Sequence, residues 1–450
     1  PGYVDKELLS YWEAKDPIPT HRNLLLSLGV TEDELSEMET EEQELVDSAR
    51  MHVEEMEWAD PSTVTIGITS LHDADSHEDH LKRLSGSVTR NEASPVLNVG
   101  ECLLKYEEKG GWTYSRAIQQ AMCDIAEQYG DSTIFMGEDM EVAGAFGMNI
   151  PLKANGHQEK LLDMPLCEAV IIHSATGAAL SGLRPMAEIQ FGGFAALAHN
   201  ALLNNAAMLR WRWGANVPLT VRIPLGAKTR SGPFHANMIE SWYANDPGLV
   251  VLAPGTPQDA YDLLREAAAL DDPVLFLEHI GLYGLRGGLT GWGQNINQKV
   301  NTEPVKKAIE SGERLKIGKA GVVRGGRDLT LVTWGAMLHI AKLAADELSK
   351  EDIEVEIIDV RTLIPFDAET CVSSVTRTGR LVILQEGQWF GGIAHSMQSR
   401  IMEEAFYALE SAPLVIGALD TPVPFSPPLE NHTVPSLEHV IKALRQVAQG

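Results

Sequence analysis

The sequence has few cysteines, few basic residues and no long apolar run, and each shortage excludes a class of protein. Its 450 residues include four cysteines, which are Cys102, Cys123, Cys167 and Cys371. They are too few and too widely spaced for a disulfide framework or a cysteine-based zinc site. No apolar run approaches the roughly 18 residues of a membrane-spanning helix. We therefore expect a protein of a reducing compartment, with no segment in a membrane.

Basic side chains are outnumbered by acidic ones. The chain has 36 Lys and Arg against 63 Asp and Glu, a net charge of -27. Such a field repels a phosphate backbone, which argues against nucleic acid as a partner. Residues 1–100 alone hold 22 Asp and Glu against 7 Lys and Arg. The acidic surplus is thus concentrated at the N-terminal end.

Several common catalytic motifs are missing. The sequence has no GxGxxG loop, no GxxxxGK[ST] loop, no HExxH and no GxSxG. This weakens interpretations as a nucleotide-dependent enzyme, a zinc protease or a serine hydrolase.

Residues 1–69 are predicted to be a helical segment. Thr31 and Glu34 form a capping box, and apolar residues recur at helical spacing at Leu35, Met38, Leu45, Ala49, Val53 and Met56. The opposite face is almost wholly acidic. A segment of this kind has no room for a core of its own, so we expect it to pack on something else.

Residues 70–98 are polar and irregular and are predicted to be a linker. Within them, the run 71–80 (LHDADSHEDH) holds three histidines and four acids. These side chains suit a metal ion, but nothing in the sequence fixes their geometry. A solvated charge run is the alternative interpretation.

After Trp112, helices alternate with short apolar strands. Strands are predicted at 133–136, 186–191, 219–223, 249–253, 274–277, 330–333, 355–358 and 381–384, and helices at 115–129, 194–211, 256–269, 337–349, 392–404 and 436–448. A further helix that ends at Ala179 follows the stretch 161–166. The alternation predicts an α/β fold with mostly parallel, helix-covered sheets. We expect one domain at 99–298, a linker at 299–318 and a second domain at 319–450.

Glu168 is a carboxylate in an apolar setting. It lies in the stretch 161–172 (LLDMPLCEAVII), beside Leu166, Val170 and Ile171, where a strand gives way to a helix. Keeping a buried carboxylate charged without a partner is costly, so it either shares a proton with a ligand or holds the proton itself. Both states suit catalysis. The alternative is a structural glutamate bound to the free amides of a helix N-terminus.

Two further features stand where α/β folds place chemistry, in loops that follow strands. The loop 226–237 (GAKTRSGPFHAN) carries Phe234 and His235, and residues 137–139 include Glu138. An exposed or structural role is the alternative for each. The residues alone do not decide between these interpretations.

From about Gly111 to the C-terminus, the chain carries five strings in a fixed order. They are IFMGEDM (134–140), DMPLCEA (163–169), GLRPMAEIQF (182–191), GPFHANMIESWYANDPGLVVLAP (232–254) and DTPVPFSPPLE (420–430). Their order and spacing resemble the beta subunit of the first, decarboxylating component of 2-oxo acid dehydrogenase complexes. That family includes the pyruvate, branched-chain and acetoin dehydrogenases. The resemblance implies a transketolase-like pyrimidine-binding domain followed by a smaller C-terminal α/β domain.

The resemblance also implies catalysis with thiamine diphosphate. Glu168 falls where the family keeps the glutamate that hydrogen-bonds N1′ of the aminopyrimidine. This contact stabilises the imino tautomer, whose nitrogen removes the thiazolium C2 proton. The family's enzymes decarboxylate a 2-oxo acid and pass the acyl group to a lipoyl disulfide on a partner protein.

Four other residues take their expected roles from the same resemblance. Glu138 matches a glutamate close to the cofactor, and Gln190 is assigned to the cofactor site. Phe194 matches the aromatic residue that stacks on the aminopyrimidine, with ordinary core packing as its alternative. His235 matches the beta-subunit active-site histidine, as a proton donor or an orienting group.

The chain departs from the family pattern in two places. Residues 235–237 read His-Ala-Asn where His-Ser-Gln is common, and His173 stands where a glycine is usual. These departures leave open which 2-oxo acid is used and what His173 does.

Residues 2–60 resemble the C-terminal helices of the family's alpha subunit. We therefore expect an alpha/beta fusion of which this chain is only a part. The family's motif for diphosphate and Mg²⁺ begins with Gly-Asp-Gly, belongs to the alpha part and is missing here. We accordingly assign no metal ligand to this chain and expect Mg²⁺ and the diphosphate to be bound by an alpha-type portion.

The resemblance implies two further partners, and the few cysteines favour a reducing compartment. A second copy of the chain in an alpha2beta2-type assembly and a lipoyl-bearing acyltransferase are expected. The bacterial cytoplasm, or alternatively the mitochondrial matrix, is the expected location.

Two other functions remain open on the sequence. A thiamine-diphosphate-dependent carboligase on the same scaffold would form an acyloin instead of acylating a lipoyl group, and His173 and the altered His235 loop would favour it. A non-catalytic assembly subunit would be expected to lack the activating carboxylate, which is present as Glu168.

Overall fold

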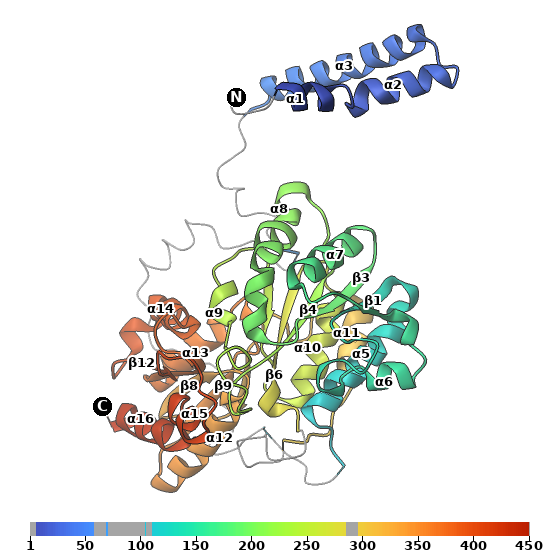
Figure 1. Cartoon of the computed structure of the whole chain (residues 1–450). Coiled ribbons are helices and arrows are strands. Elements are labelled where there is room, and N and C mark those ends of the chain that lie inside the picture. Colours follow the sequence, from blue (N-terminus) through green and yellow to red (C-terminus); the bar gives the residue numbers. More distant parts are fainter. Residues whose placement is uncertain (1–5, 58–68, 71–103, 105–109, 285–295, 450) are drawn as a thin grey trace. The chain divides into compact units, whose positions relative to one another are not determined.

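The computed structural model describes residues 6–57, 69–70, 104, 110–284 and 296–449 (Figure 1). The chain divides into two units, Pro1–Val64 and Thr65–Gly450. Among the described residues, no helix is long and apolar enough to cross a membrane.

The first unit consists of the helices α1 (Lys6–Glu13), α2 (Pro17–Ser27) and α3 (Glu32–Glu55). The predicted capping box is confirmed, because Glu34 and Thr31 each donate a backbone N–H to the other's side chain. Of the described residues in this unit, only Leu35 is buried. These helices therefore form no core of their own over their described length, as the sequence predicts.

The second unit contains a seven-stranded sheet. Across it lie β10 (Thr362–Ile364), β5 (Val250–Leu252), β6 (Val274–His279), β4 (Thr220–Leu225), β3 (Arg184–Glu188), β1 (Thr133–Gly137) and β2 (Leu161–Asp163). All neighbouring pairs are parallel except β10 with β5. The carboxyl ends of β1 to β6 therefore meet at one edge of the sheet.

A second sheet has five strands. Its order is β12 (Leu414–Ala418), β11 (Leu381–Gln388), β8 (Leu329–Thr333), β9 (Val355–Asp359) and β7 (Gly321–Arg324). Only β7 runs antiparallel to its neighbour. Both sheets are thus mostly parallel, and the predicted α/β fold class is confirmed.

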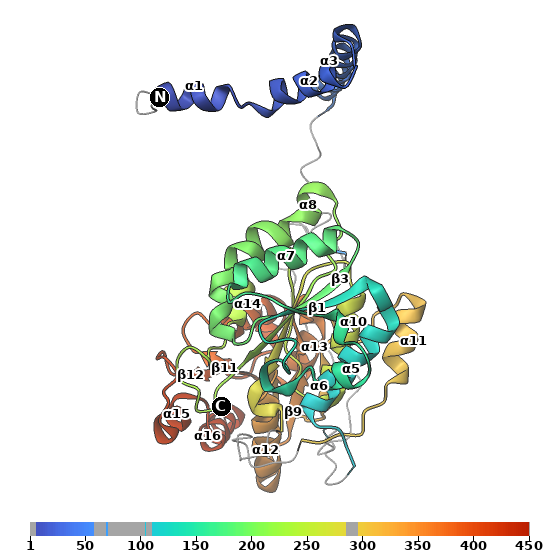
Figure 2. The same ribbon diagram turned by 45° about the vertical axis from the view of Figure 1, so that its right-hand side comes forward.

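Helices cover both faces of each sheet (Figure 2). One face of the first sheet carries α5 (Tyr114–Tyr129), α6 (Ile150–Ala154), α10 (Pro257–Ala269) and α11 (Glu303–Ser311), and the other carries α7 (Glu168–Leu180) and α8 (Leu209–Trp213). Around the second sheet lie α12 (Met337–Leu348), α13 (Ala368–Thr378), α14 (Ile393–Ala405), α15 (Pro427–Thr433) and α16 (Leu437–Gln449). The short helix α9 (Glu240–Tyr243) lies between β4 and β5 in sequence, and its Tyr243 packs in a core cluster that also contains residues of the second sheet.

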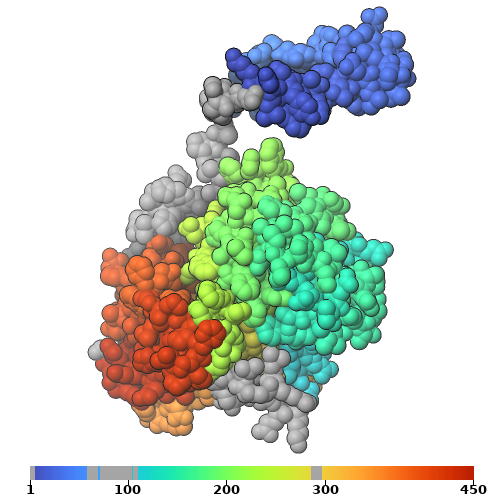
Figure 3. All heavy atoms as spheres, in the orientation of Figure 1, coloured from blue at the N-terminus to red at the C-terminus, as the bar shows by residue number. Residues whose placement is uncertain are grey.

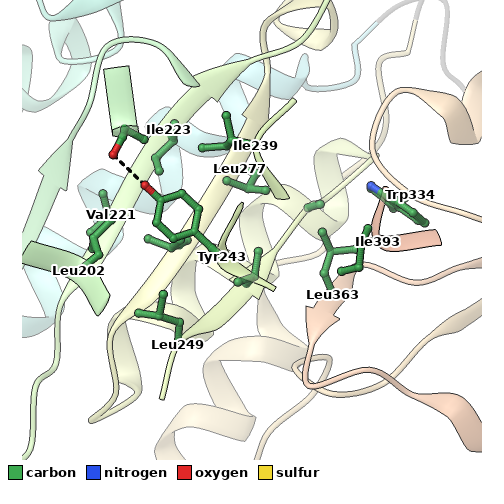
Figure 4. Close-up of a cluster of buried hydrophobic side chains, with 14 of the residues drawn as sticks. Leu202, Val221, Ile223, Ile239, Tyr243, Leu249, Leu277, Trp334, Leu363 and Ile393 are labelled. Atoms are coloured by element: carbon green, nitrogen blue, oxygen red, sulfur yellow. Dashed lines mark hydrogen bonds between the residues drawn. The ribbon is translucent and has the colours of Figure 1, made fainter. Parts of the chain in front are cut away.

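The second unit has two lobes, one built on the seven-stranded sheet and one on the five-stranded sheet. One apolar core runs through both lobes, which abut in the space-filling view (Figure 3). Tyr243 and Leu363 lie in it on the side of the first sheet, and Trp334 and Ile393 contribute from the second lobe (Figure 4). The Tyr243 hydroxyl donates a hydrogen bond to the Ala195 carbonyl at 2.7 Å. Because this core is continuous, loops from the two lobes can be held against each other at fixed positions.

Three predicted elements differ from the structure. The helix predicted at 194–211 is broken into a 3₁₀ segment (Gly192–Ala198), a π segment (Ala201–Asn205), a 3₁₀ turn (Ala206–Met208) and α8. The strand predicted at 186–191 ends at Glu188, and the stretch 299–318 contains α11. The alanines of 194–211 favour a helix, but its three asparagines compete for backbone groups and π turns interrupt regular winding.

Candidate functional site

Four of the five predicted site residues follow strands of the first sheet. Glu138 comes directly after β1, and Gln190 follows β3. Glu168 begins α7 after β2, and His235 lies in the loop that follows β4. The strand order brings all four to the carboxyl edge of one sheet, the edge at which parallel α/β sheets bind ligands.

Glu168 is the first residue of α7 and is 7% exposed. Its predicted burial is confirmed, but the apolar setting inferred from its neighbours is only partly right. Ile171 is fully buried, whereas Leu166 is 85% and Val170 43% exposed. Leu166 precedes the helix, and Val170 points away from the face that carries Ile171, because successive helix residues are about 100° apart.

Glu138 is 5% exposed and lies near Glu168. Burial raises the pKa of the Glu138 carboxyl, and the charges of Glu168, Asp139 and Glu188 raise it further. The structure thus brings together two buried carboxyl groups that are separated by 30 positions in sequence. The Glu168 charge thus disfavours the ionised form of Glu138.

The turn after β1 keeps Glu138 in place. Gly137 lies so close to β3 that a Cβ atom there would stand 3.1 Å from the Glu188 carbonyl oxygen. Asp139 has a φ of 56°, in the left-handed region that non-glycine residues seldom adopt. Gln190, half-buried after β3, donates a hydrogen bond to the Asp139 carboxylate at 3.3 Å. Gln190 therefore holds the loop that carries Glu138.

His235 lies among aromatic rings. Its ring centroid is 4.4 Å from that of Phe191 and 5.4 Å from that of Phe194, both in edge-to-face geometry. Phe191 also meets Phe194 at 5.8 Å and Phe146 at 5.7 Å. These contacts bring the predicted residues Phe194 and His235 together. Phe194 is half-buried and packs on the core, so the core packing named as its alternative is present, and its role in stacking on an aminopyrimidine stays a prediction.

A pair of glycines lets the His235 loop approach this aromatic group. A Cβ atom on Gly193 would stand 2.3 Å from the Phe234 carbonyl oxygen, and one on Gly192 would stand 2.8 Å from the Asn237 carbonyl oxygen. Side chains at these two positions would push the loop away.

The His235 ring is oriented by its own loop. Its Nδ1 lies 3.2 Å from the Ser231 carbonyl oxygen. A carbonyl oxygen only accepts hydrogen bonds, so Nδ1 carries the hydrogen in this contact. In the neutral ring, Nε2 is then the nitrogen able to accept a proton.

A buried charge cluster lies beneath the carboxyl edge. Arg222 of β4 donates to Glu188 at 2.6 Å and to Glu278 at 2.6 and 2.9 Å. Burial raises the pKa of Glu188 although Arg222 opposes the effect. Glu188 in turn contributes to the raised pKa of Glu138, which connects the cluster to the site.

Sequence reasoning missed Phe191, Phe146, Arg222 and Glu188. Phe191 ends the string GLRPMAEIQF and Glu188 lies inside it, so position within that string is the available signal. Arg222 offers none, because its role depends on partners in two other strands. His173 is exposed on α7, where its Nδ1 lies 2.9 Å from the Asn205 side-chain nitrogen.

In the part of the chain that the structure describes, no group of three or more His, Cys, Asp or Glu side chains is arranged to hold a metal ion. The run 71–80, considered above as a metal site, lies outside the described residues.

Comparisons with known proteins agree with this geometry. The family "Transketolase, pyrimidine binding domain" matches residues 111–285, and "Transketolase, C-terminal domain" matches residues 318–440. A solved structure described as a split gene transketolase, inactive beta4 tetramer, matches with a TM-score of 0.56 at 20% identity, over 76% of this chain and 99% of that one. At this identity, the structural match shows the fold alone.

Curated relatives are more similar in sequence. The beta subunit of acetoin:2,6-dichlorophenolindophenol oxidoreductase from Cupriavidus necator is 37% identical, over 70% of this chain and 88% of the relative. The pyruvate dehydrogenase E1 component subunit beta of Bacillus subtilis is 35% identical, over 71% and 93%. The 2-oxoisovalerate dehydrogenase subunit beta of the same organism is 32% identical, over 75% and 98%. The resemblance inferred from the five strings is confirmed, and the chain belongs to the 2-oxo acid dehydrogenase family of E1 beta subunits, with transketolase-type pyrimidine-binding and C-terminal domains.

Proposed function

We propose that this chain supplies the aminopyrimidine side of a thiamine diphosphate site in an enzyme that oxidatively decarboxylates a 2-oxo acid. In this proposal, the acyl group passes to a lipoyl group on a partner protein. The observation that carries the proposal is the pair of buried carboxyls, Glu138 and Glu168, at the edge of the sheet where Phe194 and His235 also lie.

The chemistry of these side chains fits one half of the cofactor. An aminopyrimidine has ring nitrogens and an amino group that pair with carboxyls, and a flat face that contacts aromatic rings. When bound, thiamine diphosphate supplies a nucleophilic carbon that attacks the 2-oxo group. The residues Glu138, Gln190 and Phe194 would hold the aminopyrimidine.

The same side chains do not suit a diphosphate, which needs cations or backbone amides. Lys228 and Arg230, the basic residues of the His235 loop, bind the side chains of Asn431 and Glu430. We therefore assign the diphosphate and Mg²⁺ to an alpha-type portion outside this chain. That residues 2–60 are the end of such a portion stays a prediction.

Glu168 is proposed to hold and move a proton at N1′ of the aminopyrimidine. Its neighbour Glu138 takes up protons more readily than an exposed glutamate, because burial and the Glu168 charge raise its pKa. A raised pKa of this kind favours a protonated carboxyl beside Glu168. His235 is proposed to orient the substrate or donate a proton to it through Nε2.

The complete enzyme is proposed to be an alpha2beta2-type assembly that delivers acyl groups to a lipoyl-bearing acyltransferase. Names of the relatives support this, since all three are beta subunits and one is a component of pyruvate dehydrogenase. A reducing compartment, the bacterial cytoplasm or a mitochondrial matrix, stays part of the proposal.

The test uses the chain assembled with an alpha-type portion, thiamine diphosphate and Mg²⁺. Pyruvate, 2-oxoisovalerate and acetoin are supplied with 2,6-dichlorophenolindophenol, the acceptor named in one relative, and separately with a lipoyl domain. We expect dye reduction with at least one substrate and acylation of the lipoyl domain with a 2-oxo acid. Release of an acyloin at a rate unaffected by the lipoyl domain would instead establish the carboligase. Absence of turnover with every substrate would refute both.

A further inference from the structure

The loop that carries His235 is fixed at two buried carboxylates of the C-terminal lobe. Glu386, in β11, accepts a hydrogen bond from the Ala227 N–H at 2.7 Å. Glu430, in α15, accepts hydrogen bonds from the N–H groups of Lys228 at 2.9 Å and Arg230 at 3.3 Å. Three N–H groups within four consecutive residues thus bind two carboxylates, an arrangement we call the loop clamp.

Both carboxylates of the loop clamp are shielded from water. Glu430 is 0% and Glu386 4% exposed. Glu386 is also bound to the His279 ring at 2.8 Å, and Glu430 is also bound to the Arg230 guanidinium. Hydrogen bonds to a charged acceptor are about twice as strong as neutral ones. The clamp therefore attaches this loop to the rest of the fold through charge-assisted, buried hydrogen bonds.

The backbone of the clamped segment is unusual. Lys228 has a φ of 70° and Arg230 a φ of 59°. Residues other than glycine seldom adopt this left-handed conformation, and it persists only where surrounding contacts hold it. Here those contacts include the N–H groups of the same two residues, both bound to Glu430, and the Arg230 guanidinium, which is bound to Glu430 and Asn431. Without that carboxylate, the segment loses the backbone contacts of both left-handed residues, which favours relaxation toward ordinary backbone angles.

Relaxation of the segment would reach His235 through one residue. Ser231 follows Arg230, and its carbonyl oxygen accepts the hydrogen bond that orients the His235 ring. The same ring packs edge-on against Phe191 at 4.4 Å. The direction of His235 Nε2 thus depends on where the clamp holds residues 227–230.

We propose that Glu430 is a positioning residue for His235. It acts through the backbone of Lys228 and Arg230 and through the Ser231 carbonyl, and it sets the direction of Nε2 without touching the substrate. Glu386, with His279, anchors the start of the same loop. The inference rests on the proposed function for its catalytic consequence, but the positioning itself is independent of activity.

The first experiment measures position without turnover. The full chain in its assembly is treated with diethyl pyrocarbonate, which attacks unprotonated imidazole nitrogen, and the rate of His235 modification is followed by mass spectrometry. In Glu430→Gln one acceptor oxygen becomes an NH₂ donor, so either the two N–H groups or the Arg230 guanidinium loses its acceptor, and the loop loosens. We expect modification about tenfold faster, the loss of one charge-assisted hydrogen bond. Glu438→Gln, at an exposed glutamate of the next helix, should match the wild type.

Equal modification rates in the wild type and Glu430→Gln would overturn the inference. If Glu430→Gln fails to fold, Glu430→Asp replaces it. This variant keeps the charge but withdraws the carboxylate from the loop, and it should show a smaller rise in the same rate.

The second experiment is a double-mutant cycle on turnover. Glu430→Gln should lower kcat about a hundredfold in the wild-type background and should have no further effect in a His235→Ala background, because it acts through His235. An equal loss in both backgrounds would show a merely structural role and would overturn the inference. A wild type that turns over no substrate would refute the proposed function instead, while the modification rates would still report on the clamp.

Discussion

Two carboxyl groups held near each other away from water do not both ionise without an electrostatic penalty. Glu138 and Glu168 are two such groups. The pKa of Glu138 is raised because its carboxyl is buried and lies near the Glu168 charge. The N-terminus of α7 favours the Glu168 carboxylate, but a second buried carboxyl beside it adds a repulsion that a neutral side chain of similar shape would avoid. Retained strain of this kind is expected where a site needs a proton at neutral pH.

Replacing Glu138 tests this argument. Glu138→Gln removes an ionisable group whose charged form is disfavoured, so we expect turnover to fall about tenfold to a hundredfold while the thermal midpoint at pH 8 stays equal or rises. Dye reduction and thermal unfolding measure the two effects. Glu141→Gln, at an exposed position three residues on, should change neither. A Glu138→Gln variant that is fully active would remove this residue from the site.

For single residues, the sequence predicts burial where burial depends on neighbouring positions in the chain. Glu168 stands at the start of a helix in an apolar stretch, and this context predicts its burial. The same context does not predict that Leu166 is exposed. The burial of Glu188 with Arg222 is not predictable in this way. It depends on pairing between β3 and β4, whose residues are 34 positions apart.

At the scale of elements, the site depends on one close backbone approach. The segment Gly192–Ala198 and the loop that carries His235 touch through main-chain atoms at Gly193. Backbone, unlike a flexible side chain, cannot move aside without shifting the whole loop. The two elements therefore have to keep a glycine between them.

Gly193→Ala should separate the two elements. The added Cβ would stand 2.3 Å from the Phe234 carbonyl oxygen, so we expect a loss of about 1 to 3 kcal/mol in the free energy of unfolding and faster modification of His235. Urea unfolding and mass spectrometry measure these effects.

Gly177→Ala is the matched control, because a Cβ atom at Gly177 would have no neighbour within 4 Å and the residue lies in the middle of α7. It should stabilise the protein by about 0.5 to 1 kcal/mol. Destabilisation by both variants alike would contradict the close-approach argument.

Element type is predicted well where apolar periodicity is regular, and poorly where side chains compete with the backbone. The helix at 256–269 appears as α10 (Pro257–Ala269). The helix at 194–211 is instead a series of 3₁₀, π and α turns. Periodicity predicts that this segment is helical, but it does not predict whether each turn is 3₁₀, α or π. That choice depends on the asparagine side chains and on packing against Tyr243.

At the scale of the whole molecule, the two lobes of the second unit share buried polar groups as well as an apolar core. Glu240, at the start of α9, is 2% exposed and lies against β11, where a Cβ on Gly387 would stand 3.3 Å from its Oε1. Burial raises the pKa of Glu240 from 4.5 to about 7, and the Glu386 charge contributes. The junction between the lobes therefore titrates near neutral pH.

This titration predicts a pH-dependent stability. Below pH 4.5, Glu240 is protonated in both the folded and the unfolded chain. As the pH rises from 4.5 to about 7, the unfolded chain releases its proton first, so the folded state loses stability. The loss amounts to about 3 kcal/mol.

Glu240→Gln does not titrate. The free energy of unfolding by urea is measured for the variant and for the wild type. The difference between them should shift in favour of the variant by about 3 kcal/mol as the pH rises from about 4.5 to 8. In Glu369→Gln, at an exposed glutamate, the difference from the wild type should stay constant. A constant difference for Glu240→Gln as well would contradict the buried, raised pKa.

The central claim is that Glu168 activates thiamine diphosphate, and the most direct measurement is the rate at which the bound cofactor exchanges its C2 proton with deuterated water. The rate is compared between the wild type and Glu168→Gln, each assembled with the alpha-type portion and saturated with cofactor and Mg²⁺. The expected result is that Glu168→Gln exchanges about 10²- to 10⁴-fold more slowly with an unchanged unfolding midpoint. Exchange at the wild-type rate in Glu168→Gln would contradict it.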